Sequence, residues 1–335
     1  MRWGIAAGLV AAMVAFGFGV YFFAGMLRAG HHVVRKPTEV SAPSLPGTVY
    51  VVQDGALYRF QHGSFRQITS ATGWMQPSAA PNDQLVAVQR HANFSDLYLL
   101  SGSGKTVAQL SHNSSTQAIE DNHWTFYPRF SPDGGAVFYD FDPKDPFNSY
   151  RVDLAIFVSP MHAGARAMEW TSPNDYTGGD VQPVPLRDGS LLYTKYSIDD
   201  SFQVHSQIWI QKQAGSGGAA LTAPEMGCGS PAVSADEKLI AMVCNRGSNT
   251  SAELDVSALD IAAQTLGSPA TLVSSRLVAS PAFSPDGKTV AFLAPSSPGG
   301  HFQLWTVGSS GPASLKQITS ELALDSASAP VWLAG

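Results

Sequence analysis

The sequence contains few charged residues and only two cysteines. Lys, Arg, Asp and Glu make up 14% of its 335 residues, against about 25% in an average soluble domain. Two cysteines exclude a disulfide framework and a cysteine-rich zinc cluster. The formal net charge is −6 and no basic cluster occurs, so nucleic acid is not expected as a partner.

Familiar catalytic motifs are also missing. No G-x-S-x-G sequence is present, and no two histidines have the H-x-x-x-H spacing of a helical zinc site. The motif search leaves open a catalytic set assembled from distant segments. What the sequence does have is 31 glycines and 22 prolines, a content that favours many turns over long helices.

Residues 1–27 form the longest apolar segment. No charged residue lies within residues 4–27, and a helix of this length would span about 36 Å, enough for a ~30 Å hydrocarbon core. A cleaved signal peptide has a shorter apolar region of ~7–15 residues, so we prefer an uncleaved transmembrane anchor. Small residues recur at Ala7, Ala11 and Ala15. This spacing would allow a homodimer through the helix, although alanine is also simply frequent in membrane spans.

A proline-containing linker, residues 28–47, separates this anchor from the rest of the chain. The charges that flank residues 4–27 favour a cytoplasmic domain by about one charge only, which is close to neutral. Residues 48–335 are predicted to form the folded domain.

One phrase recurs throughout that domain. Its best copies are PRFSPDGGAVFY from Pro128 and PAFSPDGKTVAF from Pro281. Weaker copies begin at Pro77, Pro183 and Pro231, and a truncated copy begins at Pro330. The copies are 48–55 residues apart, which is the length of one four-stranded propeller blade.

The two ends of the domain indicate the number of blades. The chain ends with a lone first strand, and it begins after the linker with three strands over 48–53, 56–60 and 65–70. One blade is therefore shared between the termini, which closes the ring and removes free sheet edges. The prediction is an all-β, six-bladed β-propeller of four-stranded blades, preceded by one transmembrane helix.

The repeated hairpin P-x-[FW]-S-P-D-G, followed by an [IL]-[YW]-[VL] strand and an [LI]-T ending, closely resembles the TolB-type six-bladed propellers. The resemblance covers residues 48–335 and is strongest at Pro128 and Pro281. It implies a propeller fold in an envelope or exported setting. Periplasmic members of that family act as interaction hubs, and related propellers cap peptidases.

The two cysteines are expected to face each other. If the turn pairs Ser284 with Lys288, the same hairpin fifty residues earlier pairs Cys228 with Cys244. Sulfurs on adjacent antiparallel strands are close enough to bridge, and the bond would stabilise the fold by roughly 3 kcal/mol. A disulfide would place the domain outside the cytoplasmic membrane; two buried free thiols are the alternative.

The long loops are expected on the rim opposite the strand one–two turns, and long loops on a rigid scaffold often carry function. Aromatic side chains near carboxylates are typical anchors of protein or peptide contacts, although some of these rings could instead fill blade interfaces. The candidate partner-binding residues are Trp124, Tyr127, Phe147, Tyr150, Asp175 and Tyr176.

An acidic loop contains Asp140, Asp142 and Asp145. Such a loop could bind calcium, which takes six to eight oxygen ligands; a solvated acidic loop is the other interpretation. Taken together, the features predict a membrane-anchored, extracytoplasmic binding scaffold for a protein or peptide, without catalysis and without a required cofactor. The alternative is a metal-dependent carbohydrate-processing or peptidase-related propeller enzyme.

Overall fold

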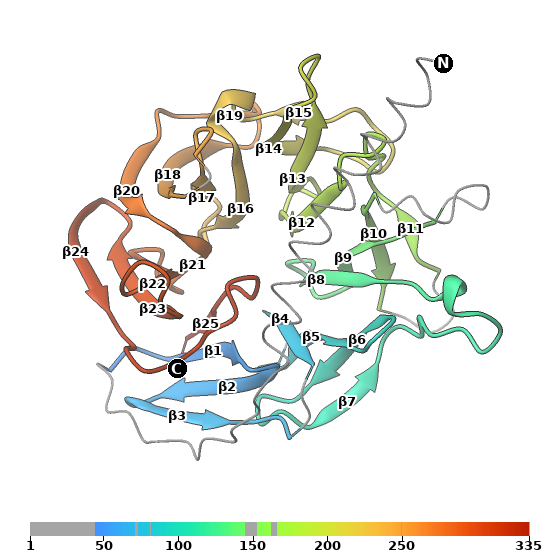
Figure 1. The fold of residues 1–335 in the computed structure, drawn as a ribbon, viewed down its shortest axis with the longest axis horizontal. Coiled ribbons are helices and arrows are strands. Elements are labelled where there is room, and N and C mark those ends of the chain that lie inside the picture. The colour runs from blue at the N-terminus through green and yellow to red at the C-terminus, as the bar shows by residue number, and fades with distance from the viewer. Residues whose placement is uncertain are drawn as a thin grey trace. The chain divides into compact units, whose positions relative to one another are not determined.

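The computed structural model describes residues 44–70, 73–80, 82–144, 153–161, 166–248 and 250–334. Residues from Glu39 onward form one compact unit. In the described part of this unit, 25 strands form six antiparallel sheets that follow one another around a ring (Figure 1). The all-β, six-bladed prediction is confirmed.

Each blade has its first-named strand nearest the centre of the ring. The blade shared by the termini contains β25 (Val331–Leu333), β1 (Thr48–Gln53), β2 (Ala56–Gln61) and β3 (Ser64–Gln67). The next two contain β4 (Trp74–Ala79), β5 (Leu85–Arg90), β6 (Ser95–Leu100) and β7 (Thr106–Gln109), then β8 (Thr125–Phe130), β9 (Ala136–Phe141), β10 (Ala155–Pro160) and β11 (Met168–Glu169).

The remaining three blades continue in chain order. They contain β12 (Asp180–Pro185), β13 (Leu191–Ile198), β14 (Val204–Gln211) and β15 (Ala219–Ala220), then β16 (Cys228–Val233), β17 (Leu239–Cys244), β18 (Ala252–Asp260), β19 (Thr265–Leu266) and β20 (Ala270–Arg276), and finally β21 (Ala279–Phe283), β22 (Thr289–Pro295), β23 (Phe302–Gly308) and β24 (Gly311–Gln317). Two short 3₁₀ turns, η1 (Ile119–Asp121) and η2 (Pro224–Met226), lie in connections between blades.

The ring closes where the sequence predicts. β25 pairs antiparallel with β1, and Val49 lies opposite Trp332. The Trp332 indole also donates a hydrogen bond to the Pro46 carbonyl at 2.8 Å. The two ends of the domain are thus held in one sheet, and no blade in the ring lacks a neighbour.

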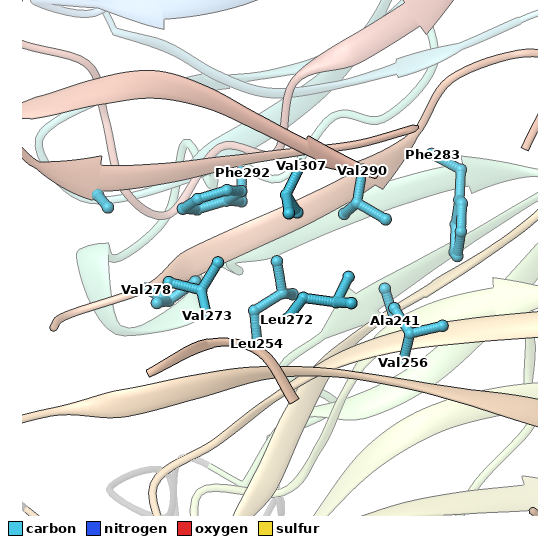
Figure 2. Packing of buried hydrophobic residues seen from close by; sticks show 11 residues of the cluster. Ala241, Leu254, Val256, Leu272, Val273, Val278, Phe283, Val290, Phe292 and Val307 are labelled. Atoms are coloured by element: carbon cyan, nitrogen blue, oxygen red, sulfur yellow. The ribbon is translucent and has the colours of Figure 1, made fainter. Parts of the chain in front are cut away.

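Apolar side chains between adjacent blades form the core. The largest cluster has eleven buried residues and lies between β16–β20 and β21–β24, with Leu254, Leu272 and Val273 facing Val290 and Phe292 (Figure 2). Such burial stabilises by about 1.5–3 kcal/mol for each large side chain. The repeat exists because every blade must cover a face of the next.

The threonine that ends many repeats has a structural role. Hydroxyls of Thr69, Thr171, Thr222 and Thr319 each accept a hydrogen bond from a backbone N–H of a third strand, at 2.9–3.0 Å. Ser111 replaces threonine in the blade β4–β7 and accepts from Leu97 N–H. These bonds therefore attach the residues that follow the outermost strand to the third strand, past the last hydrogen bond of the ladder.

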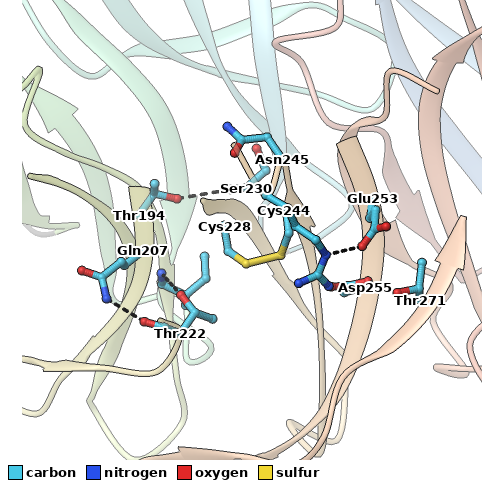
Figure 3. The surroundings of a disulfide bond; sticks show 12 residues. Thr194, Gln207, Thr222, Cys228, Ser230, Cys244, Asn245, Glu253, Asp255 and Thr271 are labelled. Atoms are coloured by element: carbon cyan, nitrogen blue, oxygen red, sulfur yellow. Dashed lines mark hydrogen bonds and ion pairs between the residues drawn. A yellow bond between two sulfur atoms is a disulfide. The ribbon is translucent and has the colours of Figure 1, made fainter. Parts of the chain in front are cut away.

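Cys228 and Cys244 form the predicted disulfide across β16 and β17 (Figure 3). The register beside the turn was predicted wrongly by one residue, because Ser234 bonds to Leu239 rather than facing Lys238. A bulge between Gly229 and Ala232 removes this offset and brings the cysteines opposite each other.

The described residues include no helix long and apolar enough to cross a membrane. The predicted anchor, residues 1–27, and residues 28–43 of the linker lie outside the described residues.

Candidate functional site

The two rims of the ring differ. The turns from first to second strand, such as 131–135 and 284–288, have five residues. We call the opposite rim the long-loop rim; it carries the connections 110–124, 170–179 and 199–203 and the described ends, 142–144 and 153–154, of the connection between β9 and β10. These four connections all belong to the blades β8–β11 and β12–β15 or lead into them.

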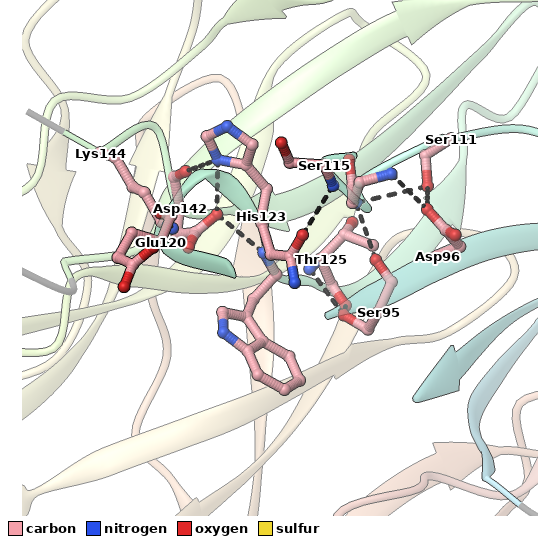
Figure 4. A network of polar contacts seen from close by, with 12 residues as sticks. Ser95, Asp96, Ser111, Ser115, Glu120, His123, Thr125, Asp142 and Lys144 are labelled. Atoms are coloured by element: carbon pink, nitrogen blue, oxygen red, sulfur yellow. Dashed lines mark hydrogen bonds and ion pairs between the residues drawn. The ribbon is translucent and has the colours of Figure 1, made fainter. Parts of the chain in front are cut away.

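Hydrogen bonds hold the connection 110–124 in place (Figure 4). Asn113 donates from its side chain to the Ser95 carbonyl at 2.7 Å and from its backbone to Asp96 at 2.8 Å. At the other end of the loop, the Asp142 carboxylate accepts from the Trp124 backbone N–H at 2.8 Å and contacts His123 Nδ1 at 3.1 Å. The loop is therefore a fixed surface.

Trp124 itself is half-buried. The Arg90 guanidinium lies over its ring at 5.6 Å, and the Phe126 ring stacks at 6.0 Å. Trp124 thus packs partly within the molecule, in accord with the alternative that some predicted rim aromatics fill space between elements.

Asp153 positions the exposed Tyr176. The buried Asp153 carboxylate accepts hydrogen bonds from the backbone N–H groups of Tyr176, Thr177 and Gly178 at 2.7–3.0 Å. Tyr176 has a φ of 59° and its side chain is 65% exposed. A left-handed backbone is unfavourable for a bulky residue, so the three bonds account for this conformation.

The hairpin formed by β13 and β14 extends beyond its neighbours as two eight-residue strands. Ile198 lies opposite Val204, and these side chains are 40% and 58% exposed, while Phe202 at the tip is 79% exposed. Asp199 accepts from the N–H groups of Ser201 and Gln203, which fixes the tip.

This hairpin and the Tyr176 loop are neighbours. The Tyr196 N–H donates to the Gly179 carbonyl at 3.1 Å, and Lys195 reaches the Ser172 carbonyl at 3.5 Å. Tyr176 lies in the connection that leads into this blade, and Ile198, Phe202 and Val204 lie at the end of its hairpin, so all four exposed apolar side chains are on the long-loop rim. We call these four residues the rim patch.

Two fully buried carboxylates lie beneath this rim. Burial raises the pKa of Asp140 well above its usual value, with Asp180 acting in the same direction and Arg129 opposing it. Burial also raises the pKa of Asp180, against the effect of Lys195, whose ammonium lies 2.9 Å away. Burial raises the pKa of Asp142 as well, although the Trp124 N–H bond and His123 oppose it.

The central channel is lined by one segment from each blade. Its lining includes Gln76, Tyr127, Gln182, Ser230 and Ser280. Each of these five residues precedes a proline, has a φ of 48–60° and lies in a bulge of its innermost strand.

The bulges turn backbone N–H groups towards the preceding blade. Gln76 Oε1 accepts from Tyr127 N–H, Asp140 accepts from Gln182 N–H, and Gln182 Oε1 accepts from Ser230 N–H, at 2.9–3.2 Å. These bonds link adjacent blades around the channel, and they satisfy donors that a bulge removes from the ladder.

The predicted site residues therefore fall in different places. Tyr176 and the exposed Asp175 lie on the long-loop rim, Trp124 is half-buried there, and Tyr127 lines the channel. Phe147 and Tyr150 lie outside the described residues.

The suggested calcium ligands have other partners where they are described. Asp140 links two blades and Asp142 fastens the Trp124 loop, while Asp145 lies outside the described residues. In the part of the chain that the structure describes, no three His, Cys, Asp or Glu side chains gather as a metal site requires.

Sequence reasoning missed Asp153, Phe202 and Arg129. The sequence gives no local signal for the long-range bonds of Asp153. Arg129 does have a signal, because the residue after the repeat proline is Ser78, Val184, Ala232, Ala282 or Val331 in the other blades and arginine only here.

Comparison with known proteins agrees with the fold. No protein-family model matches the sequence, and no curated protein matches it. Among solved structures, TolB from Acinetobacter baumannii is similar over 86% of this chain and 67% of its own, with 19% identity and a TM-score of 0.62.

Two further structures extend the comparison. A protein described as putative TolB from Agrobacterium tumefaciens is 15% identical over 86% of this chain and 94% of its own, with a TM-score of 0.58. A gluconolactonase from Xanthomonas campestris is 15% identical over 87% and 90% of the chains, with a TM-score of 0.53. At these identities the likeness shows the propeller fold alone.

Proposed function

We propose that this protein is an extracytoplasmic scaffold that binds a protein partner through the rim patch. The observation that carries the proposal is the exposure of Tyr176, Ile198, Phe202 and Val204 on ordered backbone. Clustered exposed apolar side chains are typical of interaction surfaces, and aromatic anchors dominate binding energy at such surfaces.

The surrounding charge suggests what the partner offers. Asp199 and Asp200 at the hairpin tip and Asp175 beside Tyr176 are exposed. Complementary charge favours association and selects partners. We therefore expect an apolar contact surface on the partner with basic residues at its edge.

The location of the domain belongs to the same proposal. The disulfide between Cys228 and Cys244 suits an oxidising compartment, and residues 4–27 would tether the domain to the membrane. A homodimer through Ala7, Ala11 and Ala15 would add a second copy of the rim patch to each assembly.

Paired substitutions test the rim patch. Tyr176→Ser combined with Phe202→Ser should reduce partner recovery at least tenfold, because anchor residues typically contribute 2 kcal/mol or more. The measurement is affinity purification of the tethered protein from membranes with quantitative mass spectrometry. Val107→Ser, an exposed valine near the opposite rim, is the matched control. Equal recovery from the double variant and the control would refute the proposal.

The enzyme alternative has one observation in its favour. Asp140 and Asp180 are buried carboxyls with raised pKa values close to the channel, and a raised pKa suits a general acid. Hydrolysis of a lactone or sugar substrate that EDTA abolishes and calcium restores would support this alternative. The same activity in Asp140→Asn would count against it.

A further inference from the structure

Arg129 occupies a position that the other blades give to small or apolar residues. It follows the repeat proline Pro128 in β8, where the equivalent residues are serine, alanine or valine. Among the described residues that line the channel, Arg129 is the one with a charged side chain. Nothing in the propeller fold requires an arginine there.

The guanidinium has no partner that would explain its presence. Arg129 makes no hydrogen bond and no ion pair with any described residue. Tyr127 and Asp140 both favour the charged form of Arg129 without a hydrogen bond or ion pair to it. The Asp140 carboxylate accepts the Gln182 N–H at 3.1 Å. Burial lowers the pKa of Arg129. The residue is only partly buried and lines the channel, so the cation remains open to a ligand that enters the channel.

The channel wall also carries polar side chains. Ser230 Oγ accepts a bond from Gln182 Nε2 at 3.1 Å, which leaves the Ser230 hydroxyl hydrogen for another acceptor. Hydroxyl and amide side chains with one arginine form a site that is mainly donating. A single positive charge matches a single negative charge, and the planar guanidinium matches a carboxylate in a two-bond geometry.

We propose that the central channel binds a ligand whose carboxylate group pairs with the Arg129 guanidinium. The group belongs either to a small organic acid or to the C-terminal end of a peptide. The described lining of the channel includes Arg129 and no residue of the rim patch, so the carboxylate site is independent of that patch.

Binding should depend on the carboxylate and on the arginine. The probes are acetate, triglycine and triglycine amide, titrated by calorimetry into the full-length protein in detergent. We expect acetate or triglycine to bind and triglycine amide to bind at least tenfold more weakly than triglycine. Stronger binding of triglycine than of acetate would identify the C-terminal end of a peptide as the ligand. Stronger binding of acetate would identify a small organic acid.

Variants distinguish carboxylate binding by Arg129 from a purely structural role of this residue. Arg129→Gln should weaken binding of the preferred probe at least tenfold, and Arg129→Lys, which keeps the charge but not the paired donors, should weaken it less. Arg66→Gln, the same change at an exposed position of β3, should bind as the wild type does. The double variant Tyr176→Ser, Phe202→Ser should also bind normally, so failure of the rim patch and failure of the channel site are distinguishable.

A stability measurement covers the case in which Arg129→Gln folds poorly. Arg129→Met removes an uncompensated charge from the channel, so its thermal unfolding midpoint should rise above that of the wild type. A lower midpoint would show that Arg129 supports the fold and would overturn the proposal. Equal binding of triglycine and its amide, no binding of either carboxylate probe, or unchanged binding by Arg129→Gln would also overturn it.

Discussion

The two halves of the ring are held together differently. The interface between β16–β20 and β21–β24 has eleven buried apolar residues, whereas the two interfaces of the blade β8–β11 have four and five. Buried aspartates show the opposite distribution. Five of them, Asp96, Asp140, Asp142, Asp153 and Asp180, lie in the half from β4 to β15, and Asp255 alone lies in the other half of the described ring.

The strength of the repeat does not explain this difference, because its best copies, at Pro128 and Pro281, lie one in each half. In the apolar half, each blade mainly covers the next with apolar side chains. In the other half, hydrogen bonds to carboxylates hold long loops, and each such bond contributes about 0.5–3 kcal/mol net. The long loops, the rim patch and Arg129 all occur in the half that depends on polar contacts.

The largest expected effect is in the apolar half. Phe292→Ala should lower the free energy of unfolding by about 3–5 kcal/mol, because the ring is fully buried and its removal leaves a cavity. Phe138→Ala, in the small cluster beside β12–β15, should lower it less. Chemical denaturation of both variants provides the comparison, and an equal or larger loss for Phe138→Ala would remove the contrast between the halves.

Loss of the disulfide should have the next largest effect. Replacing Cys228 and Cys244 with alanine should lower the free energy of unfolding by roughly 3 kcal/mol, since the bond constrains a loop of 16 residues in the unfolded chain. Urea unfolding with and without reductant measures this. A wild-type midpoint that reductant leaves unchanged would contradict the prediction.

The polar half should respond to pH. The folded pKa of Asp140 is raised, so the folded state holds this proton more tightly than the unfolded state does. The stability from Asp140 is therefore present below the unfolded value of about 3.9 and is lost as the pH rises towards the folded value. Wild-type stability relative to Asp140→Asn should therefore fall as the pH rises above about 4.

Denaturation over that pH range measures the difference. Asp121→Asn, at an exposed position of η1, is the matched control. A stability difference for Asp140→Asn that changes with pH no more than that of the control, or that grows in favour of the wild type as the pH rises, would contradict the prediction.

The smallest expected effect is a gain in the free energy of unfolding from a substitution in the apolar half. Glu237 has a φ of 59° in the turn where equivalent repeats have Gly134 and Gly287. Glu237→Gly should raise the free energy of unfolding by about 0.5–1 kcal/mol through relief of the left-handed backbone. Glu237→Ala should give no gain, and destabilisation by the glycine would mean that the contact of Glu237 with Arg187 N–H is the stronger effect.

Much of the apolar half could be predicted from the sequence. The repeat spacing fixes the blade number, and the lone strand at Pro330 indicates the closure with β1, because these depend on local patterns. The bulges could not be predicted, because the residue before a proline usually avoids helical conformations. The neighbouring sequence also gives no signal for the backbone N–H bonds between blades. The disulfide prediction was confirmed only because the bulge compensates for the one-residue error in the predicted turn register.

The polar half was less predictable for the same reason. Asp153 and Asp140 act on loops 23–25 and 42 residues away, and the exposure of Phe202 depends on how far one hairpin extends. Trp124 and Tyr127 are aromatic residues near the predicted rim, yet one packs under Arg90 and the other lines the channel. Residue type and loop length predict a functional rim, but they do not predict which of its residues face outward.

Site-specific photocrosslinking tests the central claim most directly, with a crosslinking amino acid at position 202 in one variant and at position 107 in another. Both positions are exposed, one on the rim patch and one near the opposite rim. The account predicts a discrete protein adduct from position 202 in membranes, lost on addition of Tyr176→Ser, and none from position 107. Adducts from position 107 alone, or an adduct at position 202 that Tyr176→Ser leaves unchanged, would contradict it.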